Sequence, residues 1–309
     1  MDKLIISKFY KDTLLGFHIV DDDIEMIYDF SDSEVGNVYC GIVKDITKNL
    51  SSAFVEFAEG KKGFLYLDKI LKSGDKVLVQ VKADEMKSKD YLLTTKIDLP
   101  NEKVNEVKQK FQFASPKSCL YKDNYMINTC KALSESGTEI ISDDDKVCQN
   151  LDGAKIQNLL YNNKDGISIE NTYRLGKIIS DVLSKKVWMK SGAYLVIEHT
   201  EALTTVDVNS GKNISKKTRE DNIKKINFEA ADYIIKHLKL RNISGIIIVD
   251  FINMEKEDYD ELLAYIKELA KTDEVACNVI GFTELGLLEI TRKKNRKPLG
   301  EIFCEVVND

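Results

Sequence analysis

Hydrophobic and polar residues alternate over the first part of the chain. Residues 1–34 contain three segments with this pattern, which read KLIISKFY, TLLGFHIV and IEMIYDF, and a DDD turn lies before the third. A period of two is typical of strands that bury one face. These residues are therefore predicted to form a small antiparallel meander.

Five further strand candidates follow within residues 36–98. Glycines and polar turns separate them, and they read NVYCGIVKDI, SAFVEFA, KGFLYL, KVLVQVKAD and YLLTTKI. Five short strands in so compact a segment, two of them carrying a phenylalanine, predict a small barrel of the oligonucleotide-binding (OB) type.

A change in composition marks the end of the barrel. Pro100 and Pro116 flank a stretch rich in lysine and glutamate, NEKVNEVKQKFQFAS. We interpret this stretch as a short charged helix between two folded units, because proline is poorly tolerated inside a helix and is common at its ends.

Downstream, helical and strand patterns alternate. Amphipathic helices are predicted for SIENTYRLGKIISDVLS, REDNIKKINFEAADYIIKHLKL and KEDYDELLAYIKELAKT. Strands are predicted for AYLVIEHTEA, LTTVDVN, SGIIIVDF, ACNVIGF and LGLLEITR. This alternation is typical of an α/β layer fold with a mixed sheet.

Composition narrows the class of protein. Hydrophobic residues make up 43% of the 309 residues and charged residues 31%, which is typical of a globular chain with a core. No apolar run is long enough to span a bilayer, and the first residues lack a signal-peptide core. The six cysteines show no C-x-x-C spacing, so the sequence indicates neither a disulfide framework nor a zinc cage. We expect a cytoplasmic protein.

Two aspartates are the strongest candidates for chemistry. Asp207 in TTVDVNSGK and Asp250 in GIIIVDFINM each lie near the end of an apolar strand, where the functional groups of open α/β sheets gather. Two carboxylates from neighbouring strands would suit a hard cation such as Mg²⁺. Asn209 lies two positions after Asp207 and so on the same face of its strand. The alternative is that each aspartate only caps a turn.

Basic and aromatic residues provide the candidates for binding. The net charge of −6 argues weakly against a protein that binds polyanions with its whole surface. Two basic runs nevertheless leave strands of the C-terminal part, one beginning at Lys212 and one at Arg292 and Lys293, so a shared phosphate groove is plausible. In the barrel, Phe54 and Phe64 are candidates for base stacking and Lys89 for a phosphate contact, unless the two rings belong to the barrel core.

Several long segments resemble the ribonuclease E/G family. The barrel segments VGNVYCGIVKDI, SSAFVEFAEGKKGFLYL and VLVQVKADEMKSKDYLLTT are similar to its N-terminal part, which holds an S1 RNA-binding motif. KVWMKSGAYLVIEHTEALTTVDVNSGK, RNISGIIIVDFINM and GLLEITRKKNR are similar to its catalytic segment. The resemblance covers residues 1–98 and about 185–304, and it is weaker between them.

The resemblance implies a multidomain α+β and α/β protein. Residues 1–34 and 99–187, the latter beginning with the linker helix, would form an RNase H-like subdomain interrupted by an S1-like OB barrel at 35–98. Residues 188–309 would form a DNase I-like catalytic subdomain.

The resemblance also implies an activity and its residues. The family cleaves single-stranded RNA with Mg²⁺, for which Mn²⁺ is a possible substitute. Asp207 and Asp250 would hold the metal and Asn209 would be the catalytic asparagine, while Phe54, Phe64 and Lys89 would hold RNA. Cleavage by water would leave 5′-phosphate and 3′-hydroxyl ends.

Three departures from the family pattern qualify these expectations. No Arg-Thr pair follows the barrel, so we expect little sensing of a 5′-monophosphate. No C-P-x-C element follows Cys304, so we expect no zinc and no zinc-linked assembly, but a monomer or a weak homodimer. Asn253 stands where the family usually has aspartate, which could weaken metal binding.

Two other functions remain open at this point. One is a non-catalytic S1-type RNA-binding protein on a degenerate nuclease scaffold, which Asn253 would favour. The other is a metal-dependent nuclease that acts on DNA, which the S1-like barrel makes less attractive.

Overall fold

The computed structural model describes residues 2–9, 13–47, 51–68, 70–85, 90–163, 166–211, 219–294 and 296–304. The chain divides into two compact units. One consists of Met1–Asp29 together with Cys130–Asp309, and the other of Phe30–Thr129.

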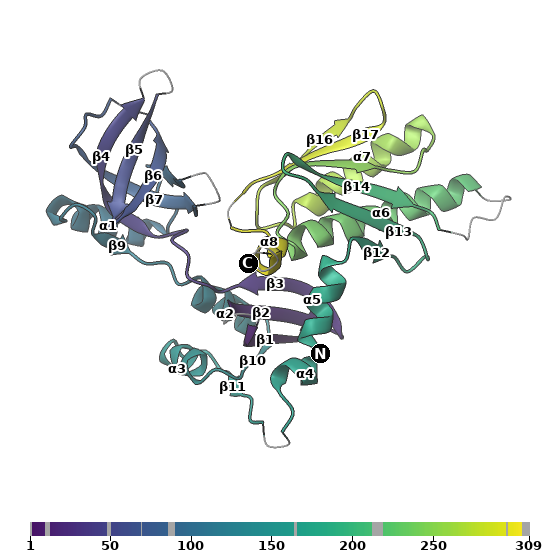
Figure 1. Cartoon of the computed structure of the whole chain (residues 1–309), viewed down its shortest axis with the longest axis horizontal. Coiled ribbons are helices and arrows are strands. Elements are labelled where there is room, and N and C mark those ends of the chain that lie inside the picture. The colour runs from purple at the N-terminus through teal and green to yellow at the C-terminus, as the bar shows by residue number, and fades with distance from the viewer. Residues whose placement is uncertain are drawn as a thin grey trace. The chain divides into compact units, whose positions relative to one another are not determined.

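The second unit contains a closed five-stranded barrel of the OB type (Figure 1). Its strands pair in the order β5-β6-β8-β7-β4, and β4 pairs with β5 to close the ring. The strands are β4 (Val38–Thr47), β5 (Ser52–Ala58), β6 (Lys61–Tyr66), β7 (Lys76–Ala83) and β8 (Tyr91–Thr94). The five strands that the alternating pattern predicts are thus confirmed.

Tight packing inside the barrel explains the placement of Gly41. A Cβ atom at this position would lie 2.4 Å from Cγ1 of Val55, closer than any real contact. Val55, Phe57 and Val79 are fully buried in the barrel core. Only glycine lets β4 approach these side chains closely enough for the ring to close.

The barrel unit extends further along the chain than the sequence predicts. The charged helix is confirmed as α1 (Asn101–Phe113), and a short strand, β9 (Cys119–Tyr121), follows it. β9 pairs with the barrel strand β4. Because of this pairing the segment up to Thr129 packs with the barrel, so the boundary lies about 30 residues beyond the expected one at 98/99.

In the first unit, strands from before and after the barrel unit pair in one sheet. Its order is β11-β10-β1-β2-β3, and β1 pairs in parallel with β10, from Lys3 opposite Glu139 to Ile6 opposite Ser142. The strands are β1 (Asp2–Phe9), β2 (Thr13–Val20), β3 (Asp23–Asp29), β10 (Glu139–Ser142) and β11 (Leu159–Leu160). The barrel unit is therefore an insertion between β3 and the later strands of this sheet.

The helices of this region are α2 (Tyr125–Glu135), α3 (Asp145–Gly153), α4 (Ile169–Tyr173) and α5 (Leu175–Leu183). The sequence predicts α4 and α5 as one continuous helix, and this is wrong. Arg174 between them adopts a left-handed conformation, with φ 53° and ψ 40°. In an unbroken helix Ile169 and Leu175 would point about 120° apart. The break lets both side chains enter the same core.

The C-terminal part forms a mixed six-stranded sheet in the order β12-β13-β14-β15-β17-β16. Only β14 and β15 pair in parallel. The strands are β12 (Lys186–Trp188), β13 (Tyr194–His199), β14 (Leu203–Asn209), β15 (Gly245–Asp250), β16 (Cys277–Phe282) and β17 (Leu287–Arg292). The predicted strands and the mixed sheet are confirmed, and β12 is an addition.

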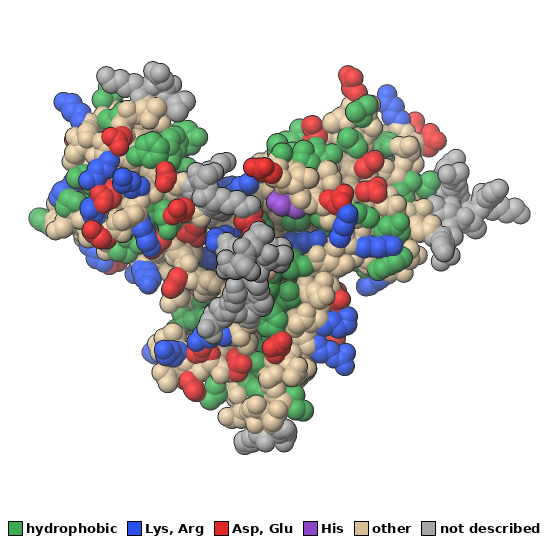
Figure 2. All heavy atoms as spheres, viewed as in Figure 1, with side chains coloured by type: hydrophobic (Ala, Val, Ile, Leu, Met, Phe, Trp, Pro, Cys, Tyr) green, Lys and Arg blue, Asp and Glu red, His purple; other side chains and the backbone are tan. Residues whose placement is uncertain are grey.

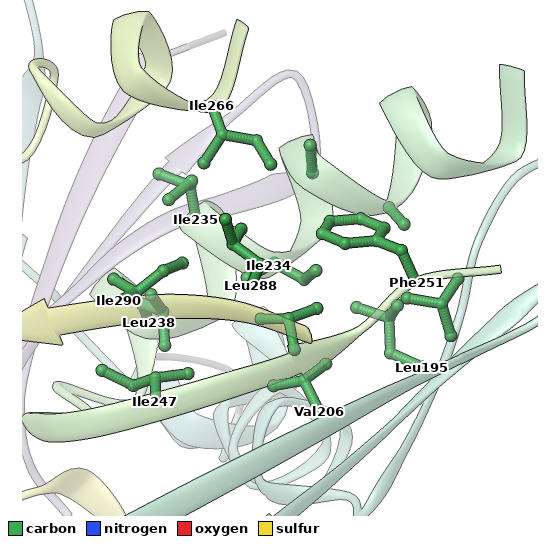
Figure 3. Packing of buried hydrophobic residues seen from close by; sticks show 14 of the residues in the cluster. Leu195, Val206, Ile234, Ile235, Leu238, Ile247, Phe251, Ile266, Leu288 and Ile290 are labelled. Atoms are coloured by element: carbon green, nitrogen blue, oxygen red, sulfur yellow. The ribbon is translucent and has the colours of Figure 1, made fainter. Parts of the chain in front are cut away.

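Two helices, α6 (Arg219–Leu240) and α7 (Lys256–Ala270), pack on one face of this sheet (Figure 1). Figure 3 shows Ile234 and Ile235 of α6 and Ile266 of α7 packed with apolar side chains from the strands. The opposite face is partly open, since Trp188 is 60% and Ile246 50% exposed. Any binding groups on that face are accessible to a large ligand.

The two sheets of this unit share contacts. Leu240 at the end of α6 and Leu299 of α8 (Leu299–Cys304) are buried in the core of the N-terminal sheet. Lys236 forms an ion pair with Asp23 at 2.9 Å, and Nη1 of Arg296 donates to the Asp29 carbonyl at 2.9 Å. Among the described residues, every helix is too short or too polar to span a lipid bilayer.

Candidate active site

Asp207 and Asp250 lie directly opposite each other on neighbouring strands. The parallel pair β14 and β15 aligns them in register, and each is at or near the C-terminal end of its strand. Adjacent strands run about 4.8 Å apart. Both side chains are exposed, because Val206, Val208 and Val249 take the alternate positions facing the helices. The two predicted carboxylates therefore converge on the open face of the sheet.

Asn209 is placed beside this pair. It follows Asp207 by two residues and so projects from the same face of β14. Its Nδ2 atom donates a hydrogen bond of 2.7 Å to Oδ2 of Asp207. The amide thus holds one oxygen of the Asp207 carboxylate.

A buried asparagine holds the loop that follows Asp250. Asn227 of α6 is fully buried, and its Nδ2 atom donates to the carbonyl of Ile252 at 2.7 Å. In return the Ile252 amide donates to Oδ1 of Asn227 at 3.2 Å. The sequence analysis missed Asn227. The sequence feature that points to Asn227 is a polar residue next to Ile226, on the apolar side of an amphipathic helix.

Gly211, two residues after Asn209, packs closely against a neighbouring turn. Gly211 has a positive φ of 67°, and a Cβ atom there would lie 2.5 Å from the carbonyl oxygen of Gly192. The neighbouring Ser191 amide donates to Oε1 of Glu229 on α6 at 3.1 Å. Helix α6 therefore holds the loop at Ile252 and the Ser191–Gly192 turn against which Gly211 packs.

The donor atoms at this site suit Mg²⁺. That ion prefers oxygen ligands and is commonly held by one or two carboxylates, with waters and substrate phosphates completing its shell. Asp207 and Asp250 supply such a pair. In the part of the chain that the structure describes, no three His, Cys, Asp or Glu side chains cluster closely enough to hold a metal. Asn253 is exposed in the loop after Asp250 and adds no charge.

The aromatic residues of the barrel form a cluster of their own. Phe54 and Phe64 lie opposite each other on β5 and β6, with ring centroids 5.6 Å apart. Both are half-buried, and neither belongs to the barrel core. Tyr66, which the sequence analysis missed, is 67% exposed, and its ring lies 5.0 Å from that of Phe64. Its signal was its position two residues after Phe64, on the same face of the strand.

The predicted basic contacts have different outcomes. Lys89 and Lys212 lie outside the described residues. Lys293 is exposed just after β17. Arg292 is only 2% exposed, and its Nε and Nη2 atoms contact the Asp273 carboxylate at 2.6 and 3.0 Å. The prediction that Arg292 binds RNA is therefore wrong.

The physical reason is the alternation along β17. Leu288 and Ile290 face the helices, and Arg292 continues that row into the interior. Its Nη1 atom donates to Oδ1 of Asn242 at 2.9 Å and to the Ile243 carbonyl at 3.0 Å. The charge is thus satisfied inside the fold.

A second arginine is also used inside the fold. Arg241 is 7% exposed, and its Nη2 atom donates to the Ser184 carbonyl at 2.7 Å. Its Nε atom donates to Nδ1 of His237 at 3.2 Å. Burial, reinforced by the charges of Arg241 and Lys236, lowers the pKa of His237 to about 3. His237 is therefore neutral at pH 7 and accepts this hydrogen bond.

Charge on the visible surface is mixed. Figure 2 shows acidic and basic side chains interspersed over both units. The face in view therefore carries no broad basic field, which agrees with the net charge of −6.

Comparison with known proteins identifies relatives. The model of the ribonuclease E/G family matches residues 66–295. Ribonuclease G of Haemophilus influenzae is 41% identical over 138 residues, which are 44% of this chain and 28% of the relative. Ribonuclease G of Escherichia coli K12 is 42% identical over 127 residues, 41% of this chain and 26% of the relative.

A third relative is aligned with most of the chain. Ribonuclease E of Synechocystis is 24% identical over 370 aligned residues, which cover 90% of this chain and 55% of the relative. The chain thus spans about a quarter to a half of the length of these relatives. The resemblance seen in the sequence is confirmed.

The first prediction concerns the two neighbours at the end of β17. Arg292→Ala should lower the free energy of unfolding by about 3–5 kcal/mol, because it leaves the buried Asp273 carboxylate without its partner. Lys293→Ala, at an exposed position, should lower it by less than about 1 kcal/mol. Urea denaturation followed by circular dichroism measures both. Equal losses would contradict the structural role of Arg292.

The second prediction concerns the support of the Asp250 loop. Asn227→Ala removes both partners of the Ile252 backbone and should cost about 1–3 kcal/mol of stability. Hydrogen exchange at the Ile252 amide should accelerate more than at amides of β14. Lys225→Ala, an exposed change on the same helix, is the control. Unchanged exchange at Ile252 in Asn227→Ala would show that the loop does not depend on this side chain.

Proposed function

The chain belongs to the ribonuclease E/G family, and from this membership and the geometry of the site we propose that it is an endoribonuclease that hydrolyses single-stranded RNA with Mg²⁺. Asp207 and Asp250 would hold the metal, with Mn²⁺ as a possible substitute, and Asn209 would position the Asp207 carboxylate. RNA processing or decay is the cellular role that this activity would serve. Mg²⁺ is the proposed cofactor.

One observation carries this proposal. Asp207 and Asp250 are exposed and in register on the two parallel strands of the sheet, and Asn209 donates to Asp207. An aspartate that only caps a turn would not need to lie in register with a second aspartate. An arrangement of two carboxylates and an amide on an open face supports catalysis on a large anionic substrate better than it supports a purely structural role.

The chemistry follows from the demands of phosphodiester hydrolysis. A divalent cation, when bound, supplies charge neutralisation at the phosphate oxygens and lowers the pKa of a coordinated water. The carboxylates fix the position of that cation, and the Asn209 amide holds Asp207 in one orientation. Because water attacks in place of the ribose 2′-hydroxyl, the products would carry 5′-phosphate and 3′-hydroxyl ends.

The barrel would bind the RNA strand. Phe54 and Phe64 present half-buried rings outside the barrel core, which suits stacking on unpaired bases. We propose that this barrel acts as an S1-type module, with Lys89 as a phosphate contact. Lys212 would contact a phosphate near the carboxylates. Lys293 would contact the strand further along, because β17 places it at the opposite end of β15 from Asp250. Stacking requires splayed bases, so the proposed substrate is single-stranded.

The subdomain assignments belong to the same proposal. The sheet that joins β1 to β10 would be the RNase H-like subdomain, and the sheet with β14 and β15 the DNase I-like subdomain.

Five cysteines are free thiols, namely Cys40, Cys119, Cys130, Cys148 and Cys277. Free thiols are usual in a reducing compartment, which supports a cytoplasmic location. We propose a monomer or weak homodimer.

The third prediction tests the catalytic assignment. Asp207→Asn and Asp250→Asn should each reduce cleavage of a labelled A/U-rich RNA by about 100-fold or more, because the metal contributes several kcal/mol to the transition state. Glu268→Gln, an exposed acid on α7, should leave the rate unchanged. Cleavage by native protein should stop in EDTA.

Binding measured on the same proteins separates the alternatives. RNA affinity should survive both aspartate changes. If Asp250→Asn cuts at the native rate, the site assignment is wrong. If native protein binds RNA but never cuts it with Mg²⁺ or Mn²⁺, the non-catalytic RNA-binding alternative is correct.

The fourth prediction concerns the barrel rings. Phe54→Ala and Phe64→Ala should each weaken RNA binding by about 1–3 kcal/mol with a small change in thermal stability. Phe57→Ala on the same strand removes a fully buried side chain and should instead cost about 3–5 kcal/mol of stability. Binding isotherms beside melting curves measure both effects. Native affinity in Phe54→Ala and Phe64→Ala would rule out stacking at these rings.

A further inference from the structure

An exposed aromatic pair lies at one edge of the C-terminal sheet. Trp188 of β12 is 60% exposed, and its ring centroid lies 5.1 Å from that of Tyr194 on β13, with the planes inclined by 57°. Val187, between Lys186 and Trp188, points into the core. Lys186 and Trp188 therefore both project from the open face. The exposed part of this tryptophan contributes little to folding and is available to a ligand.

The pair lies in line with the proposed catalytic residues. Trp188 pairs with Tyr194, and Tyr194 pairs in turn with Asn209. Side chains opposite each other across neighbouring strands are within contact range. Trp188, Tyr194 and Asn209 thus form a row across the open face, and Asp207 with Asp250 form the next row, two residues along. The aromatic rings begin one strand away from the carboxylate pair.

A lysine joins the two rings. The Nζ atom of Lys186 lies 3.6 Å from the ring centroid of Tyr194 and 4.0 Å from that of Trp188. A lysine ammonium beside aromatic rings combines the two groups that recognise a nucleotide, a stacking surface for its base and a positive charge for its phosphate.

We propose that Lys186, Trp188 and Tyr194 form a base-stacking subsite for a nucleotide next to the scissile phosphate. This inference rests on the proposed function, since it places the subsite by its distance from Asp207 and Asp250. The base would stack on the exposed indole, with the phenol beside it, and Lys186 would leave the ring faces to contact the adjoining phosphate. The subsite would hold the RNA in register over the carboxylates, in addition to the grip of the barrel.

A nucleotide fits this surface better than an apolar partner does. The aromatic area is small, carries its own cation and lies beside two carboxylates that an apolar protein surface would have to desolvate. An RNA strand can stack one base on the aromatic pair, and its adjoining phosphate can then reach a cation held by the two carboxylates. The same face therefore suits an anionic strand with exposed bases.

The test uses an RNA with one cleavage site and an abasic nucleotide placed in turn at each flanking position. In native protein, one position should lower kcat/KM by about tenfold, the loss of one stacked base. In Trp188→Ala, the intact RNA should already show that loss, mainly as a higher KM, and the abasic change at that position should add nothing. Trp188→Phe should restore most of the efficiency. Ile280→Ala, an exposed apolar change at the other edge of the sheet, should behave as native.

Two results would overturn the subsite. One is native efficiency in Trp188→Ala. The other is an abasic change that still lowers kcat/KM tenfold in Trp188→Ala at every sensitive position. The protein change and the RNA change would then act independently, so the missing base would not be the one that contacts Trp188. Thermal melting of Trp188→Ala should be nearly native, which separates lost stacking from lost fold.

A binding arm in EDTA separates this subsite from the proposed function. RNAs with 2-aminopurine at single positions are titrated with native protein and with Trp188→Ala. Fluorescence quenching at one position, lost in Trp188→Ala, would support the subsite even if the protein never cut RNA. Cleavage without such quenching at any position would overturn the subsite and leave the nuclease assignment intact.

Discussion

The parallel pairing of β14 and β15 is the constraint on which the proposed site depends. It sets Asp207 opposite Asp250, and a shift of one residue in either strand would turn one carboxylate toward the helices. Parallel neighbours need a crossover, and α6 provides it. The same helix then holds the nearby loops through Asn227 and Glu229. One connection thus creates the pairing and fixes the loops around it.

The charged residues of the C-terminal part divide into two groups by their position on the strands. Arg292 and Arg241 point inward, where their donors satisfy a carboxylate, backbone carbonyls and a neutral histidine. Lys186 and Lys293 are exposed. Buried guanidinium groups can meet several acceptors at fixed angles, whereas a lysine on a flexible stem suits a ligand that arrives and leaves. A run of basic residues is therefore no direct guide to an RNA-binding surface.

The sequence predicted the strands of the barrel and of the C-terminal sheet because their patterns are local. It also predicted the approach of Asp207 to Asp250, since both follow apolar runs that must enter one sheet. The break at Arg174 depends on a core shared by Ile169 and Leu175, and the insertion of β9 beside β4 depends on pairing across the chain. The burial of Arg292 had a signal in the row from Leu288 to Ile290, but a basic run obscured it. Asn227 acts through the backbone of a distant loop, which no local pattern reports.

The most direct test of the account is the stoichiometry of Mn²⁺ binding, measured by electron paramagnetic resonance on the native protein, on Asp207→Ala and on Asp250→Ala. The account predicts one tight Mn²⁺ ion per chain in the native protein, competed by Mg²⁺ and lost in both variants, with the fold intact by circular dichroism. Undiminished Mn²⁺ binding in either variant would contradict the claim that these two carboxylates together hold the catalytic metal.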